Sequence, residues 1–155
     1  MSWLSSADLK RLVRRHGSKE TKTAFMGIFP IDSLPKRILH FPCLLIVNTD
    51  TKNLPGKHWK AVYISKQRRG EVFDSFALPT SMRLTKWLNT FTRGRWTKTT
   101  RPIQSYLSAI CGIYVLYFVL NRLSSKDMKS LMKVFDNSVT SNDKRMLQFF
   151  STLKK

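Results

Sequence analysis

The stretch SAICGIYVLYFVLNRL, residues 108–123, predicts the element around which the fold is built. Its side chains are apolar on almost every side of a helix, and a helix of that kind has to be buried. The longest apolar run, residues 109–120, is shorter than the roughly 20 residues needed to cross a bilayer. We therefore predict a central helix in the protein core and not a membrane anchor.

Short strands and amphipathic helices are predicted on both sides of this helix. Apolar runs bounded by turn residues indicate strands at 43–47, 58–64 and 71–74, the last two forming a hairpin around the turn at 68–70. Helices are predicted at residues 5–15, 79–91, 125–135 and 142–153. Residues 16–42 are expected to be irregular, 48–57 a turn-rich loop and 95–103 an extended basic segment. Because no repeat or linker divides the sequence, we expect one α+β domain over residues 1–155.

The charge of the chain predicts a polyanionic partner. The 155 residues include 28 Lys and Arg against 9 Asp and Glu, which gives a net charge of +19. Such a surface attracts nucleic acid in a salt-dependent way. A content of 42% hydrophobic residues excludes a disordered basic tail, although a basic domain that only binds RNA stays open. The residues expected to contact DNA are Arg11, Arg14, Arg15, Arg68, Arg69, Arg95 and Lys98.

The cysteines argue against two common kinds of small domain. There are two, Cys43 and Cys111, with no CxxC spacing and no histidine-rich cluster. This pattern speaks against a disulfide framework and against a structural metal site. Residues 1–8 also lack the basic and then apolar pattern of a signal peptide. A reducing intracellular compartment fits best.

Cys111 lies where a nucleophilic thiol is expected. It falls in the first turn of the central helix, three residues after Ser108, which can cap that helix. The positive end of the helix dipole favours a thiolate, and the Cys111 N–H can point at a developing oxyanion. Gly112 would let a substrate backbone approach closely. Cys43, inside an apolar strand, is interpreted as a core residue.

Three further residues complete a possible catalytic set. His58 opens a predicted strand, Asp74 ends the partner strand between aromatic residues, and Gln104 lies seven residues before Cys111. An acid in apolar surroundings is costly unless it is paired, which suits a carboxylate that orients an imidazole. Glu71, the competing acid, should face the other side of its strand. Each residue alone has an ordinary structural explanation, and only the combination indicates a cysteine protease.

The same residues carry a resemblance to a known family. The chain resembles the adenain-type cysteine proteases, the adenovirus maturation protease family, and more distantly the SUMO-specific proteases. The segments concerned are residues 46–49, 56–59, 73–76 and 108–114, together with Gln104. The order His, Asp, Gln, Cys excludes papain itself. The resemblance spans nearly the whole chain, including the first helix and Phe29-Pro30.

This resemblance implies a fold and a set of roles. The fold would be a mixed β-sheet packed by helices, with the nucleophile at the start of the central helix. Cys111 would be the nucleophile, His58 the general base, Asp74 the third member and Gln104 the oxyanion donor. Trp59 is expected to pack over the site and shield the His58–Asp74 pair from water, with plain core packing as the alternative.

The resemblance also implies how the protein works in its setting. We expect an endopeptidase that cleaves viral precursor proteins after Gly-containing sites during virion maturation, as a monomer in the virion and host nucleus, without a membrane partner. No cofactor is needed for the chemistry, and DNA is the expected activator. An activating peptide stays open, but a disulfide tether does not fit, because no cysteine lies between Asp74 and Cys111. The alternatives are a protease that removes SUMO-like modifiers and a nucleic-acid-binding protein with a degenerate protease fold.

Overall fold

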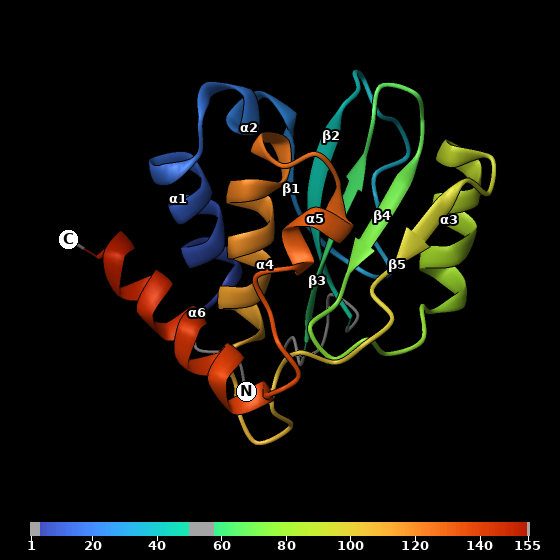
Figure 1. Cartoon of the computed structure of the whole chain (residues 1–155). Coiled ribbons are helices and arrows are strands. Elements are labelled where there is room, and N and C mark those ends of the chain that lie inside the picture. The colour runs from blue at the N-terminus through green and yellow to red at the C-terminus, as the bar shows by residue number, and fades with distance from the viewer. Residues whose placement is uncertain (1–3, 50–57, 155) are drawn as a thin grey trace.

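The centre of the molecule is a mixed β-sheet. The computed structural model describes residues 4–49 and 58–154. Its strands are β1 (Phe25–Pro30), β2 (Cys43–Asn48), β3 (Trp59–Ile64), β4 (Gly70–Phe73) and β5 (Trp96–Lys98). In the described part of the chain they form one five-stranded sheet in the order β1-β2-β3-β4-β5 (Figure 1). The outer pairs β1–β2 and β4–β5 are parallel, and the two inner pairs are antiparallel. The predicted α+β class with a mixed sheet is confirmed.

One strand was not predicted. β1 lies in the segment expected to be irregular, because Gly27 and Pro30 interrupt its sequence pattern. It is an edge strand, where proline is tolerated and where the backbone can depart from regular pairing. Gly27 has φ 133°, and the register with β2 shifts between Phe25 and Gly27. β2, β3 and β4 lie within one residue of their predicted ranges at each end.

The predicted helices are present in order but differ at their ends, and α2 (Lys19–Ala24) is an additional helix in the segment expected to be irregular. They are α1 (Ser6–His16), α2 (Lys19–Ala24), α3 (Met82–Thr92), α4 (Cys111–Asn121), the 3₁₀ turn η1 (Arg122–Ser124), α5 (Met128–Met132) and α6 (Val139–Leu153). The central helix α4 begins at Cys111 and not at Ser108, which was expected to cap it; the N-cap is Ile110, without a side-chain hydrogen bond. α6 begins earlier than predicted because Ser138 caps it. The turn-rich loop expected at 48–57 lies, from residue 50 on, outside the described residues.

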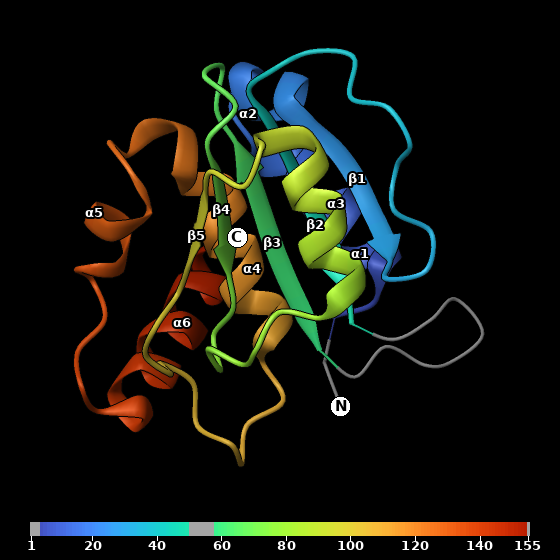
Figure 2. The same ribbon diagram turned by 90° about the vertical axis from the view of Figure 1, so that its right-hand side faces the viewer.

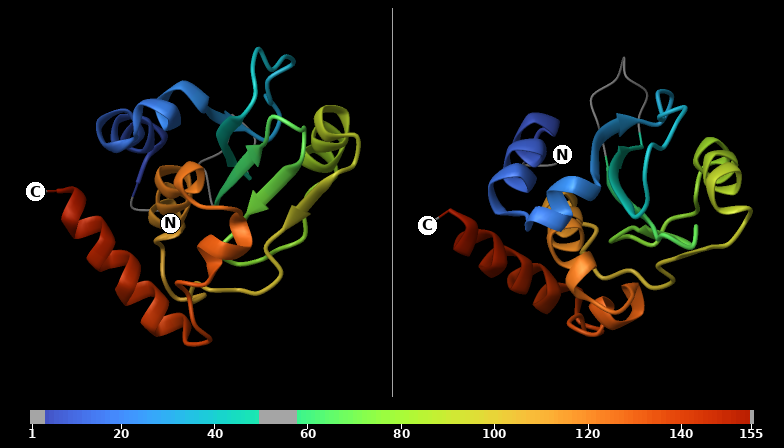
Figure 3. Two further views of the ribbon diagram at one scale, coloured as in Figure 1. Left: turned by 45° about the horizontal axis from the view of Figure 1, so that its top comes forward. Right: turned by 90° about the horizontal axis from the view of Figure 1, so that it is seen from above.

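The sheet separates two apolar cores. α4 lies against one face and is itself covered by α1 and α6, whereas α3 covers the other face (Figures 1 and 2). Seen from above, the helices around α4 and the helix α3 flank the sheet on opposite sides (Figure 3). Eight of the eleven residues of α4 are buried, as its sequence predicts. Among the described residues, no helix combines the length and the apolar character needed to span a membrane.

Candidate active site

Strand pairing brings the predicted acid and base together. In the antiparallel pair of β3 and β4, Ala61 lies opposite Phe73. If this register is continued beyond the strand ends, Lys60 lies opposite Asp74 and His58 opposite Phe76. All these pairs lie at the end of the sheet where β3 begins and β4 ends, close to the start of α4 (Figure 2). The contacts described below follow from this register.

Asp74 is the most highly connected group at this end of the sheet. Its carboxylate is almost fully buried and accepts a hydrogen bond from His58 Nε2 at 2.5 Å. The backbone N–H of Phe76 binds Oδ1 at 2.9 Å, and that of Leu78 binds Oδ2 at 3.0 Å. The Lys60 ammonium lies 3.3 Å from Oδ2. Burial raises the pKa of Asp74, but the His58 hydrogen bond and the nearby positive charges outweigh it, so that the pKa is lowered and the group stays ionised.

His58 is held as the partner of two groups. Burial would lower its pKa, but the hydrogen bonds and charges of Asp74 and Cys111 raise the pKa to about 9. Nε2 is occupied by Asp74, whereas Nδ1 is buried and makes no hydrogen bond of ordinary geometry within the described part of the chain. Because Nε2 binds Asp74, Nδ1 is the nitrogen left to interact with Cys111. An imidazole that is oriented at one nitrogen and next to a thiol at the other matches the arrangement that the sequence predicted.

Cys111 is placed at the positive end of the central helix. It is the first residue of α4 and is buried against the core that also contains Trp59 and Ile110. The N–H groups of a first helical turn have no acceptor within the helix, so they present positive charge to the thiol. Cys43 differs, because burial in β2 raises its pKa to about 12 and leaves it protonated. The two thiols thus lie in different surroundings, Cys43 inside β2 and Cys111 at the start of α4.

Gln104 is joined to this group through a residue that the sequence reasoning missed. Ser75, which directly follows Asp74, donates its hydroxyl to Gln104 Oε1 at 2.5 Å. The carbonyl of Ser75 also accepts the backbone N–H groups of Ile103 and Gln104. Gln104 Nε2 donates to the carbonyl and the hydroxyl of Ser108, both at 3.1 Å. Ser75 thus fixes the orientation of the Gln104 amide, whose N–H groups donate to Ser108 in the segment just before α4.

Lys60 and Phe76 were also missed by the sequence reasoning. The Lys60 side chain is buried, and it pairs with Asp74 and donates to the Pro79 carbonyl at 3.3 Å. The Phe76 ring stacks on His58 with centroids 4.8 Å apart. The available signal was the strand period of two, which places Lys60 on the face of His58. A lysine on such a buried face is unusual enough to indicate a carboxylate partner.

Trp59 and Gly112, the two residues expected to shape the site, are both buried. Trp59 is a member of the core cluster that contains Cys111, and its Nε1 has no partner among the described residues. The aromatic ring that stacks on His58 is that of Phe76, and the shielding role expected of Trp59 stays a prediction. Gly112 is buried in the first turn of α4. Glu71, as predicted, lies away from the site and pairs with Arg122 at 2.5 Å.

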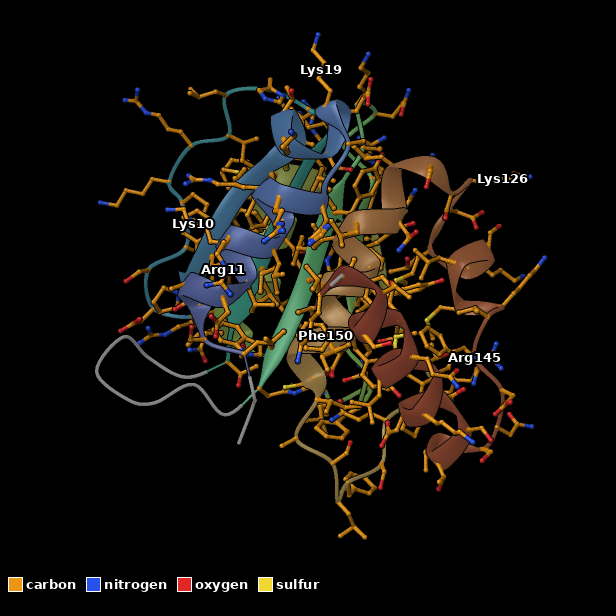
Figure 4. All side chains as sticks on the ribbon, turned by 90° about the vertical axis from the view of Figure 1, so that its left-hand side faces the viewer. Lys10, Arg11, Lys19, Lys126, Arg145 and Phe150 are labelled. Carbon is orange, nitrogen blue, oxygen red and sulfur yellow. The ribbon has the colours of Figure 1, made fainter. Side chains whose placement is uncertain are left out.

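The residues expected to contact DNA do not join the site. Arg11, Arg14 and Arg15 are exposed on α1, whereas Lys98 lies on the edge strand β5 (Figure 1). Arg95 is connected to the turn of Arg68 and Arg69 by a hydrogen bond to the Gln67 carbonyl at 2.9 Å. Figure 4 shows Lys10 and Arg11 on α1, and Lys126 and Arg145 beyond the central helix.

Within the described residues, no cluster of three or more His, Cys, Asp or Glu is placed to hold a metal ion.

Comparison with known proteins supports the fold. The sequence matches no protein-family model and no curated protein sequence. The structure is similar to the crystal structure of the ASFV pS273R protease, with a TM-score of 0.64 and 16% identity. That match covers 96% of this chain and 66% of the protease, so the chain spans slightly less than two thirds of that protein. The central domain of the uncharacterized Lpg1148 protein from Legionella pneumophila is also similar, with a TM-score of 0.50, 11% identity, and coverage of 99% of this chain and 98% of that domain. The expected family resemblance is thus supported as a protease-like fold.

Proposed function

We propose that this chain is a cysteine peptidase in which Cys111 is the nucleophile and His58 is the general base. One observation carries the proposal. A buried imidazole is bound at Nε2 by Asp74 and is influenced at its other side by Cys111, at the N-terminus of the buried helix α4. The structural similarity to a viral protease supports the same reaction class.

The proposed chemistry is acyl transfer from an amide to the thiol and then to water. Cys111 reacts as the thiolate of a thiolate–imidazolium pair in which Nδ1 of His58 holds the thiol proton. Its sulfur attacks the scissile carbonyl carbon, whose oxygen becomes an oxyanion. The start of α4 stabilises this charge, together with the Gln104 amide once it exchanges Ser108 for the oxyanion. The C–N bond then breaks, the leaving amine takes the proton from His58, and water hydrolyses the thioester.

Asp74 and its neighbours act by positioning. The carboxylate holds His58 in one orientation and stabilises the imidazolium, while Lys60 and two backbone N–H groups fix the carboxylate in turn. Phe76 covers the imidazole and keeps water from that side of the ring. The loss of one oxyanion donor typically costs about 10²–10³ in rate, which is the contribution proposed for Gln104.

We extend the proposal to a biological setting on two grounds. The similar solved structure is that of the ASFV pS273R protease, and the chain carries a net charge of +19. We propose precursor proteins of a virus, cut after Gly-containing sites in the virion and host nucleus, as the substrates of a monomeric enzyme. DNA would act as activator through the basic surface. A peptide activator, if the protein uses one, would bind without a disulfide.

The test is a peptide assay with matched cysteine variants. Wild-type protein should release the amine from a Gly-Gly peptide amide, and Cys111→Ala should lower kcat/KM by at least about 10³-fold. Cys43→Ala is the control, because it removes the other buried thiol and leaves the site intact. Iodoacetamide should alkylate Cys111 and not Cys43, as read by mass spectrometry. Turnover that persists in Cys111→Ala would overturn the proposal, as would a folded wild-type protein that neither cleaves nor is alkylated.

A further inference from the structure

Three aromatic rings form a row that leads out of the site. The His58 ring stacks on Phe76, and Phe76 stacks on Tyr106 with centroids 5.6 Å apart and planes inclined by 11°. His58 is buried, Phe76 is half-buried and Tyr106 is 77% exposed. The row therefore begins at the catalytic imidazole and ends at the surface. We refer to Phe76 and Tyr106 as the aromatic ledge.

The ledge is held in place by the groups that build the site. The backbone N–H of Phe76 is bound by the same Asp74 oxygen that accepts the His58 hydrogen bond. Tyr106 lies in a turn closed by hydrogen bonds from the backbone N–H and the hydroxyl of Ser108 to the Ser105 carbonyl, both at 3.1 Å. This turn lies between the oxyanion donor Gln104 and Cys111 in the sequence. The ledge is thus an ordered part of the site.

The exposure of this aromatic surface indicates a ligand-binding site. Large aromatic side chains bury much of their area in most folded proteins, and an exposed group of them commonly marks a binding site. Leu107, next to Tyr106, is 97% exposed and extends the apolar surface. The ledge contains no charged side chain, although the chain as a whole is strongly basic. It is suited to an apolar ligand and not to a polyanion.

The proposed reaction determines which part of a substrate would lie there. His58 gives its proton to the leaving amine, so that nitrogen has to come within hydrogen-bonding reach of the imidazole. The residue on the leaving side of the scissile bond then lies next to the ring that stacks on His58. We propose that the aromatic ledge is the subsite for this residue and that it selects an aromatic or large aliphatic side chain. This inference rests on the peptidase function proposed above.

A series of peptides that share one acyl side tests this subsite. Their first residue after the cleaved bond is Phe, Leu, Ser or Asp, and kcat/KM is measured by chromatography of the products. Wild-type protein should prefer Phe to Ser by about tenfold, the range expected for one aromatic contact in an apolar subsite. Tyr106→Ala should reduce this ratio to about twofold, whereas Tyr106→Phe should retain it. Leu39→Ala is the surface control, because Leu39 is 90% exposed in the segment between β1 and β2, and it should change neither rate nor ratio.

The outcomes separate this inference from the proposed function. Cleavage of none of the peptides by wild-type protein would overturn the peptidase proposal. Cleavage of all four without preference, or with a preference that Tyr106→Ala leaves unchanged, would overturn the subsite alone. An equal loss of rate for Phe and Ser peptides in Tyr106→Ala would assign the tyrosine a purely structural role and would also overturn the subsite.

Discussion

At the scale of single residues, the site depends on the proton of His58 and on the two groups that stabilise it, Asp74 and Cys111. His58 carries an imidazolium between a buried carboxylate and a thiol, and this raises its pKa from 6.5 to about 9. A group whose pKa is higher in the folded protein stabilises the fold fully below its unfolded pKa and loses that contribution as the pH rises through the folded pKa. The stability of this protein should therefore report directly on the site.

We expect the stability that the His58–Asp74 pair contributes to be lost as the pH rises from the unfolded pKa of 6.5 through the folded pKa of about 9, so that the free energy of unfolding measured by urea denaturation declines over this range. Asp74→Asn should make this decline shallower, because the Asp74 hydrogen bond and charge raise the pKa of His58. Glu71→Gln, on the same strand but paired with Arg122, should lower stability overall and keep the wild-type slope. Equal slopes in wild type and Asp74→Asn would contradict the assigned pairing.

The sequence predicted residues that the structure brings together, but it did not predict the residues that hold them in place. His58, Asp74 and Cys111 were accessible because their types and chain order match a known chemistry. Lys60 gave only the indirect signal of a lysine on a buried strand face, and Ser75 gave none, because their roles depend on which side chain lies opposite Asp74 and how Gln104 returns to it. The Lys60 contact arises from the register of β3 and β4, and the Ser75 contact arises from the course of the segment that contains Gln104. No local sequence motif specifies either of them. The exposed Tyr106 was missed for the same reason, since its partner Phe76 is 30 residues away in sequence.

At the scale of elements, helix ends were harder to predict than helices. The apolar character of α4 was plain, but its first residue depends on the turn before it, in which Ser108 binds Gln104 instead of capping the helix. α6 begins at Val139, three residues before its predicted start, because Ser138 caps it, while Asn142 is buried and binds the Ile103 and Asp136 carbonyls. In both places a polar side chain had two possible local partners. Tertiary contacts decided between them.

One helix end offers a test of backbone strain. Arg93, at the C-terminus of α3, has φ 56° and ψ 37°, a left-handed conformation that glycine adopts without the steric penalty of a side chain. We expect Arg93→Gly to be more stable than Arg93→Ala by about 1 kcal/mol, since the alanine retains the penalty. Urea denaturation of both variants measures the difference. The pair removes the same exposed charge, so a zero difference would contradict the strain and could not be assigned to electrostatics.

At the scale of the whole molecule, the net charge was known from the sequence but its distribution was not. Basic residues that are separate in the sequence meet across β5 and α5, where Lys98, Arg101, Lys129 and Lys133 line one groove. The basic residues of α1 form a second group on the far side of α4 from this groove (Figures 1 and 4). The Arg101 side chain is engaged with the Met132, Phe135 and Asp136 carbonyls, so it fixes the shape of the groove while adding charge to it. Glu71 and Asp127 also line this groove, so its four basic side chains outnumber two acidic ones. A concave surface with an excess of positive charge concentrates the potential more than an open helix face does.

We therefore expect duplex DNA to bind chiefly in the groove between β5 and α5. Fluorescence anisotropy at several salt concentrations should give a linear fall of log K with log salt, and Lys129→Ala/Lys133→Ala should reduce that slope by up to about 2. Arg14→Ala/Arg15→Ala removes the same number of charges from α1 and should reduce the slope less. Cys111→Ala should bind as wild type, because a buried thiol adds no phosphate contact. If the α1 variant lost more of the slope than the groove variant, DNA would follow the α1 face, and if both lost equally, the net charge and not the groove would determine binding.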